Sequence, residues 1–340
     1  MSFQSDTTAP AHPALLEALV RANDGAAASY GNDTVSTRVK AQLREIFSTD
    51  LELVFTVSGT ASNALALAVL APGDTAILCH DEAHIHRDER GAPEFFTGGA
   101  KLVPLHGEHA RMAPETLEAA LAEWPSDFVH TTPPSTLSLS NLTESGTTYD
   151  VATVKALANL AKARGMHVHM DGARFANALA HLKCDPADIT WRAGVDVLSL
   201  GATKGGALAA EAVILFPSVM DRFQTLRARQ KRAGHMVPKA RYVAAQFEAW
   251  LENGRWLELA GHANAMASEL AGGFTSIPGA KLLHPVEGNE VFIDLPQEAV
   301  DALNAANAGF YPWPHGGYRF VTSWQTKAED VARVVKAARG

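Results

Sequence analysis

Short apolar runs alternate with segments of helical period through roughly the first two-thirds of the chain. The runs are rich in Val, Ile and Leu, and such runs are typical of buried strands. We expect strands at Ala76–Cys79, Leu102–Leu105, Phe128–Val129, His167–Met170, Val195–Leu198 and Ala212–Phe216. Strands that alternate with helices in this way predict an α/β fold with a mostly parallel sheet covered by helices on both faces.

Three of the intervening segments show helical signals. After Thr60, apolar residues recur at the i, i+3, i+4, i+7 spacing as far as Val69, which predicts a helix with an apolar face. Asp150 is a typical N-cap for a second helix, and Gly165 can end that helix. A third helical stretch covers approximately residues 238–272.

The last part of the chain has a different pattern. Strands near Glu290–Leu295 and Tyr318–Thr322, and a last helix after Thr326, indicate a smaller α+β unit. We therefore expect a large α/β domain over residues 1–245, which includes the N-terminal segment, and a small C-terminal α+β domain over residues 246–340.

Composition narrows the class of protein. The chain has 340 residues, of which 47% are hydrophobic, and a formal net charge of -8 without a block of Lys or Arg. This gives no electrostatic reason to expect nucleic acid or a membrane surface as partner. Cys79 and Cys184 cannot form a disulfide framework, and no Cys/His cluster has zinc-ligand spacing. The first residues lack the pattern of a signal peptide, so we expect a cytoplasmic protein without a metal.

Ser58, Gly59 and Thr60 follow an apolar run and come directly before the first predicted helix. Glycine lets the backbone approach a ligand closely, and the first N–H groups of a helix point outward, so this segment is suited to binding an anion. An ordinary N-cap with a glycine turn has the same sequence pattern. The motif alone does not separate these two readings.

Two further segments place charged residues after predicted strands. Asp171 directly follows one strand and Arg174 lies three residues on, and parallel sheets place ligand groups at such strand ends. A carboxylate there could keep a ring nitrogen protonated, or it could simply cap a helix. Lys204 lies between small residues after the next strand, with the Thr203 hydroxyl beside it. A buried lysine in that position could form an imine, although most lysines are solvated.

Together with other motifs, these segments match one family in the right order. The matching segments are Ser5–Thr7, Tyr30–Asp33, Ser58–Asn63, Ala83–His84, Glu89–Gly91, Asp171–Arg174, Thr203–Gly205 and Tyr318–Thr322. With them the sequence resembles the threonine aldolase and β-eliminating lyase branch of fold-type I pyridoxal-phosphate enzymes, including low-specificity L-threonine aldolases and phenylserine aldolases. The resemblance covers nearly the whole chain. It implies a mostly parallel seven-stranded sheet between helices and a smaller C-terminal domain.

The resemblance also implies roles toward a pyridoxal 5'-phosphate cofactor. Lys204 would form the imine with it, Asp171 would pair with its pyridinium nitrogen, and His84 would stack on its ring. The other residues implied in cofactor binding are Ser58, Gly59, Thr60, Arg174, Thr203 and Arg241. Among these, Gly59, Thr60 and Thr203 would hold the phosphate.

A second set of implied roles concerns the substrate and a neighbouring subunit. Ser5 and Arg319 would bind the substrate α-carboxylate, and Arg174 would lie near it. Tyr30 would reach into a neighbour's active site, because family members form dimers or tetramers with shared sites. Arg241 would contact the phosphate across that interface. Its rivals in the same basic stretch are Lys231 and Arg232.

The implied reaction splits a β-hydroxy-α-amino acid, such as threonine, allo-threonine or β-phenylserine, into glycine and an aldehyde. Many family members carry a histidine in the loop before the helix that begins after Asp150, whereas residues 140–146 contain none here. The base that takes the proton of the β-hydroxyl is therefore open, with His84, His86 and a water molecule as the alternatives.

Other functions remain open at this point. The nearest is another enzyme of the same fold, such as a β-eliminating lyase, a serine hydroxymethyltransferase or an alanine racemase. A dinucleotide-binding dehydrogenase is disfavoured because no G-x-G-x-x-G follows the first strands. A non-catalytic scaffold is disfavoured because both Lys204 and Asp171 are present. We expect His130, His167 and His169, on or beside strands, to pack or hydrogen-bond within the fold.

Overall fold

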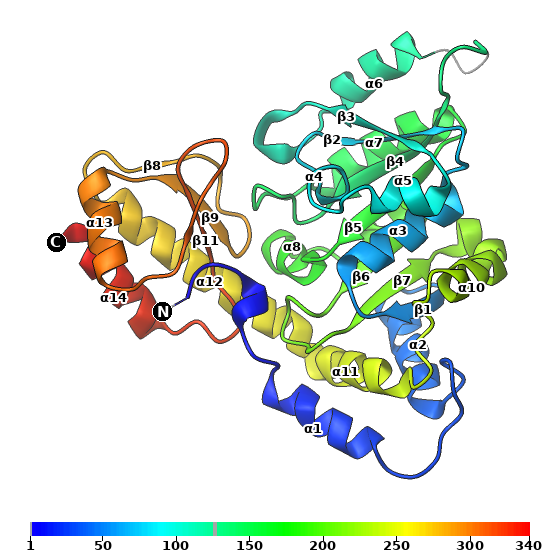
Figure 1. Cartoon of the computed structure of the whole chain (residues 1–340), viewed down its shortest axis with the longest axis horizontal. Coiled ribbons are helices and arrows are strands. Elements are labelled where there is room, and N and C mark those ends of the chain that lie inside the picture. The colour runs from blue at the N-terminus through cyan, green and yellow to red at the C-terminus, as the bar shows by residue number, and fades with distance from the viewer. Residues whose placement is uncertain (1, 125–127) are drawn as a thin grey trace.

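The computed structural model describes residues 2–124 and 128–340. Its first seven strands are β1 (Glu52–Thr56), β2 (Ala76–His80), β3 (Lys101–Leu105), β4 (Pro134–Ser140), β5 (His167–Gly172), β6 (Val197–Gly201) and β7 (Glu211–Leu215). They form one sheet in the order β1-β7-β6-β5-β4-β2-β3 (Figure 1). In this sheet β7 pairs antiparallel with β1 and β6, and the other neighbours pair in parallel. The predicted mostly parallel, seven-stranded sheet is confirmed.

Helices cover both faces of the sheet because successive strand residues point to opposite sides. On one face Val54, Val197 and Val213 pack with α3 (Gly59–Leu70), which also contacts α5 (Ala92–Thr97) and α10 (Phe223–Arg232). On the other face Leu198 and Ile214 belong to the main core. The helices on that side are α1 (Pro13–Ala22), α2 (Thr34–Ile46), α7 (Val151–Ala163), α8 (Phe175–Leu182) and α11 (Arg241–Leu251), with α6 (Pro114–Glu123) and α9 (Pro186–Ile189) beside α7.

Helix α3 is buried within the large α/β part of the molecule. Every residue from Ala61 to Leu70 is buried, so the helix is covered all round rather than on the single apolar face that its spacing predicted. A helix that is apolar on all sides belongs in the interior. Its N-terminus is therefore held in one place by the surrounding core.

One predicted strand is wrong. Phe128–Val129 forms no strand, and the two side chains are 54% and 89% exposed. The strand at this point of the sheet is β4, which reads Pro-Ser-Thr-Leu-Ser-Leu-Ser. Thr136 and Ser138 are buried in it, and the Ser138 hydroxyl is hydrogen-bonded to His169 on β5, so apolar content failed to indicate this strand.

The long helical stretch predicted over residues 238–272 is two helices. Helix α11 ends at Leu251, and α12 (Arg255–Thr275) begins after Asn253 and Gly254, which have φ angles of 54° and 73°. Two successive residues in the left-handed region cannot continue a right-handed helix.

The C-terminal part has its own antiparallel sheet and core, and thus forms the predicted smaller α+β unit. Its elements after α12 are β8 (Lys281–Leu282), β9 (Glu290–Asp294), α13 (Gln297–Ala305), β10 (Tyr311–Pro312), β11 (Tyr318–Val321) and α14 (Ala328–Arg339). Phe3 is part of this core, and its carbonyl accepts a hydrogen bond of 2.7 Å from Val321 N. The division at residues 245 and 246 stays a prediction.

Among the described helices, none combines the length and the apolarity that crossing a bilayer requires.

Candidate active site

A cavity of about 250 Å³ lies where β5 and β6 end and α3 begins. Eight residues singled out from the sequence line it: Ser58, Gly59, Thr60, His84, Asp171, Arg174, Thr203 and Lys204. They come from four separate stretches of the chain, which the parallel sheet brings to one edge. The ends of parallel strands thus bring these eight residues to one cavity.

His169 shows how the sheet below the cavity is built. Its two ring nitrogens hydrogen-bond the Ser138 hydroxyl at 2.9 Å and the Ser199 hydroxyl at 3.0 Å, so it links β4, β5 and β6. Burial lowers the pKa of His169 to about 4, which keeps the ring neutral. The expectation that His169 bonds within the fold is confirmed. Asp171, two residues on, points to the same face of β5.

Asp171 is buried, and each of its carboxylate oxygens accepts one hydrogen bond from the protein. One carboxylate oxygen accepts from Ala173 N at 2.9 Å, and the other accepts from the Asn63 amide at 2.7 Å. The same amide nitrogen of Asn63 donates to Glu89 at 2.8 Å. Asn63 and Glu89 lie in motifs that the sequence singled out, but no role was assigned to them. An amide side chain just before the apolar part of the helix was the available signal for Asn63.

His84 opens the short helix α4 (His84–Arg87) and completes this network. Its Nδ1 lies 2.9 Å from the Glu89 carboxylate. That hydrogen bond raises the pKa of His84 to about 9, against the opposing effect of burial, so the ring is an imidazolium at neutral pH. Burial in turn raises the pKa of Glu89. A cationic ring is thus fixed at one wall of the cavity.

The N-terminus of α3 provides an anion site. The Ser58 hydroxyl accepts from Ala61 N at 3.3 Å and the Ser58 carbonyl from Ser62 N at 3.1 Å. The amides of Gly59 and Thr60 precede these in the first turn, where a helix offers no acceptor of its own. Around a Cβ placed on Gly59, no atom of the described residues lies within 4 Å, which leaves room for a ligand.

Lys204 follows β6 in a tight turn. The Gly205 carbonyl accepts from the Trp250 indole at 3.1 Å, and a Cβ at Gly205 would lie 3.0 Å from that ring nitrogen, so only glycine fits comfortably. The Thr203 hydroxyl accepts from Ala210 N at 3.1 Å. Glu211 on β7 also lines the cavity, and burial raises its pKa to about 7. The sequence did not indicate Glu211.

A second cavity of about 550 Å³ adjoins the first and contains Ser5 and Arg319. Arg319 on β11 lies over the Trp313 ring, 5.0 Å from its centroid, and 3.8 Å from Glu290. Its Nη2 donates to the Gln4 carbonyl at 3.4 Å. Four residues line both cavities: His84, Glu144, Arg174 and Lys204.

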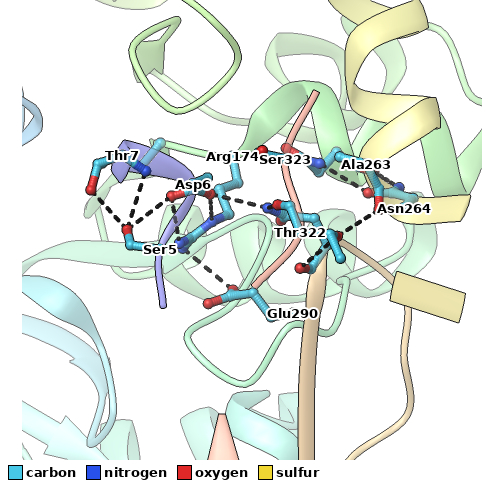
Figure 2. Close-up of polar contacts among 12 residues, drawn as sticks. Ser5, Asp6, Thr7, Arg174, Ala263, Asn264, Glu290, Thr322 and Ser323 are labelled. Carbon is cyan, nitrogen blue, oxygen red and sulfur yellow. Dashed lines mark hydrogen bonds and ion pairs between the residues drawn. The ribbon is translucent and has the colours of Figure 1, made fainter. Parts of the chain in front are cut away.

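Arg174 is held between two acids that the sequence did not assign (Figure 2). Its Nε donates to Asp6 at 2.7 Å, and its Nη1 lies 3.3 Å from Glu290. All three side chains are buried. Burial opposes the charge of Asp6, but Arg174 and Lys204 outweigh it and lower the pKa of that carboxyl.

Tyr30 and Arg241 lie elsewhere in the subunit. Tyr30 lines a different cavity, of about 490 Å³, beside α2, β1 and α10, and Lys231 lies 5.4 Å above its ring. Arg241 donates to the Gly25 carbonyl at 2.9 Å. Neither residue lines the site of its own chain, so their implied roles across an interface stay predictions.

Pyridoxal phosphate fits the first cavity. The α3 amides and the space at Gly59 suit its phosphate, the buried Asp171 carboxylate suits its ring nitrogen, and the Lys204 amine suits its aldehyde. The fold and this set of groups define a fold-type I pyridoxal-phosphate enzyme.

Comparison with known proteins gives the family. The model of the β-eliminating lyase family matches residues 2–298. The chain is 39% identical over 339 residues to the low-specificity L-threonine aldolase of Pseudomonas aeruginosa, covering 99% of this chain and 96% of that protein. It is 37% identical, with the same coverage, to the enzyme of that name from Pseudomonas sp. (strain NCIMB 10558). A threonine aldolase structure from Leishmania major superimposes with a TM-score of 0.92 at 28% identity, covering 99% of this chain and 98% of that one.

The chain belongs to the β-eliminating lyase family, and it is a pyridoxal-phosphate-dependent carbon–carbon lyase. The resemblance inferred from the sequence motifs is confirmed.

Proposed function

We propose that the protein cleaves β-hydroxy-α-amino acids of the threonine, allo-threonine and β-phenylserine type into glycine and an aldehyde. The observation that carries this proposal is the junction of the two cavities at Lys204 and Arg174. An amino acid whose carboxylate is bound by Arg319 and Ser5 in the second cavity would bring its amine and Cα to Lys204. The relatives named low-specificity L-threonine aldolases support this choice of substrate.

The residues divide the work between binding and orientation. Lys204 would hold the cofactor covalently, Asp171 its ring nitrogen, His84 its ring face, and Gly59 and Thr60 its phosphate. When bound, the cofactor supplies an electron sink for the bond that breaks at Cα. Lys204 follows β6, and the other four groups lie on β5, α4 and α3, so the ring would be held from several sides.

Arg319 would set which bond at Cα breaks. A guanidinium can bind both carboxylate oxygens at once, and Trp313 below it restricts how the group turns. Fixing the carboxylate fixes the rotation about Cα, so the Cα–Cβ bond can be held perpendicular to the cofactor ring.

We further propose that the working unit is at least a homodimer and that it acts in the cytoplasm. Tyr30 and Arg241, which the family resemblance places at a shared site, lie outside the site of their own chain. A second subunit that brings them to the cavity would complete the set of residues.

The test is to supply threonine, β-phenylserine and serine separately and identify the products. Glycine with acetaldehyde or benzaldehyde supports the proposal. Pyruvate from serine would instead indicate a β-eliminating lyase, and racemised amino acid without cleavage would indicate a racemase. Borohydride should abolish both the yellow colour and the activity, because it reduces the imine at Lys204.

A further inference from the structure

Glu144 lies in a loop that is braced on several sides. Residues 141–143 and 145–149 are buried, and Thr147 N and the Thr147 hydroxyl both bond Thr143. The loop is tied to β5 by Asn141 N, which donates to the Asp171 carbonyl at 2.9 Å. It is tied to the C-terminal unit by Glu287, which accepts from Thr148 N at 2.7 Å. The position of Glu144 is therefore set by the fold.

The Glu144 side chain lines both cavities at their junction. The charged groups whose fields act on it come from four elements: His84 on α4, Asp171 on β5, Lys204 after β6, and Glu290 on β9. Arg174 also feels its charge. A carboxylate here faces the point where a substrate bound through Lys204 and the Arg319 side of the site would extend its side chain.

The two histidines considered as bases do not suit that role. His84 Nδ1 is engaged by Glu89, and the ring is already protonated at neutral pH. His86 is exposed and lines neither cavity. Of the other side chains at the junction, Arg174 is paired with Asp6 and Glu290, and Lys204 is assigned to the cofactor. The Glu144 carboxylate is left without an assigned role.

We propose that the Glu144 carboxylate removes the proton from the substrate β-hydroxyl during Cα–Cβ cleavage. The O–H bond breaks and its proton passes to Glu144, the oxygen pair forms the carbonyl of the aldehyde, and the Cα–Cβ pair remains with Cα. Cα later gains one proton to give glycine, which balances the proton that Glu144 has taken and releases. This inference rests on the proposed aldolase function.

The ionisation of Glu144 suits a general base. Burial raises its pKa to about 7, with His84 and Lys204 opposing the rise. General-base catalysis is most effective when the pKa lies near the working pH, since the group is then both basic and substantially ionised. Because the folded-state pKa is raised, Glu144 is protonated below about pH 7 and becomes competent above it.

The test compares Glu144→Gln with a matched exposed control, Glu118→Gln on α6. Two reactions are followed in each holoenzyme: cleavage of threonine and β-phenylserine, and exchange of the glycine Cα hydrogens with deuterium. Glycine has no β-hydroxyl, so its exchange does not need this base. We expect Glu144→Gln to lose about a hundredfold in cleavage, to keep glycine exchange within about threefold, and to lose the rise of kcat/KM with pH. Glu118→Gln should behave as wild type.

A second readout does not depend on turnover. A carboxyl whose pKa is raised in the folded state destabilises the protein as pH rises and the group ionises. Replacing it with neutral glutamine should therefore stabilise the protein more at high pH than at low pH. The melting temperature of Glu144→Gln minus that of wild type should be larger at pH 8 than at pH 5. A difference independent of pH would contradict the burial of this charge.

Two outcomes would overturn the inference. One is a Glu144→Gln variant that cleaves at the wild-type rate. The other is an equal loss of cleavage and glycine exchange, because that would indicate a role in binding or folding. If wild type and Glu118→Gln exchange glycine but cleave neither substrate, the proposed function itself fails, and this result is distinct from both.

Discussion

The polar side chains of the active site form hydrogen-bonded networks that join different elements. Asp171 on β5 is bound by Asn63 on α3, and Asn63 also binds Glu89, which fixes His84. Removing one member leaves a buried polar group without a hydrogen-bond partner. This usually costs more free energy than the hydrogen bond itself contributes to stability. Single substitutions here should therefore be informative.

Asp171→Asn should leave the cofactor bound but lower the rate by about a hundredfold, the loss typical of one electrostatic contact to developing charge. A neutral amide cannot stabilise a protonated ring nitrogen, so the ring becomes a poorer electron sink. The measurement is kcat at saturating cofactor, with the exposed Asp24→Asn as control. Wild-type turnover in Asp171→Asn would remove Asp171 from this role.

Arg319→Lys should lower kcat/KM for threonine by about 10- to 100-fold, as expected for loss of a charge-assisted hydrogen bond. The charge remains, but the two-point contact and the packing on Trp313 are lost. Cofactor affinity, measured by titration, should stay unchanged. Equal losses of substrate and cofactor affinity would instead assign Arg319 to the structure or to the cofactor side.

Residues that the motifs named, such as Lys204, Asp171 and His84, do meet in one cavity. The sequence analysis did not indicate the partners of these residues, because the role of each partner depends on a contact between distant segments. Asn63 matters only because β5 places Asp171 beside it, and Asp6 only because it meets Arg174, 168 residues away. Glu144 and Glu211 carry no local signal, since the raised pKa of each comes mainly from burial in the folded chain.

At the scale of elements, the predicted strands other than Phe128–Val129 lie within a few residues of observed strands, whereas the apolar strand β1 was not predicted. The sequence analysis missed β4, because buried hydroxyl groups take the place of apolar side chains there and are hydrogen-bonded to neighbouring residues. The sequence analysis missed the break between α11 and α12. Asn253 and Gly254 reveal it through their left-handed backbone angles, which only the structure gives. Loop 141–149 likewise depends on the C-terminal unit for its shape.

Gly146→Ala tests how far that loop determines activity. Gly146 has a φ of 73°, and a Cβ there would lie 3.1 Å from Glu290 Cβ and 3.2 Å from its carbonyl oxygen. Gly25→Ala is a matched control, because its φ is 61° but no described atom lies within 4 Å of the added Cβ. Both variants should lose about 1–2 kcal/mol to left-handed strain. Gly146→Ala should lose about 1–3 kcal/mol more to crowding.

Cleavage should fall in Gly146→Ala alone, since the added methyl group crowds Glu290 and Glu144 lies two residues away in the same loop. Denaturant unfolding and steady-state kinetics measure the two effects. Equal unfolding free energies of the two variants would mean that the loop accommodates the added methyl group at no extra cost. That result would argue against a fixed position for Glu144.

At the scale of the whole molecule, the N-terminal segment fastens the two units together. Asp6 binds Arg174, which follows β5 of the large sheet (Figure 2). Asn289 of the C-terminal unit donates to the same carboxylate at 3.1 Å. Phe3 lies in the C-terminal core. The site between the units therefore depends on residues from both ends of the chain.

Asp6→Asn should destabilise the protein by about 3–5 kcal/mol, because Arg174 would keep its buried charge with only Glu290 to balance it. The Asp6 pKa is lowered in the folded state, so its contribution is complete above its ordinary value of 3.8 and is lost as pH falls. The difference in unfolding free energy should thus shrink in acid. A difference that stays constant to pH 3 would contradict this account.

Shared sites between subunits can be tested by mixing two inactive variants. Lys204→Ala should abolish turnover, and Tyr30→Ala should lower it strongly if Tyr30 acts in a partner's cavity. After the two variants are unfolded and refolded together, a mixed dimer has one site that combines Lys204 of one chain with Tyr30 of the other. Random pairing should restore about a quarter of the wild-type activity.

Separately refolded variants are the control, and sedimentation measures the size of the assembly. If verified mixed dimers recover no activity, Tyr30 acts within its own subunit. A fully active monomer would contradict the shared site altogether.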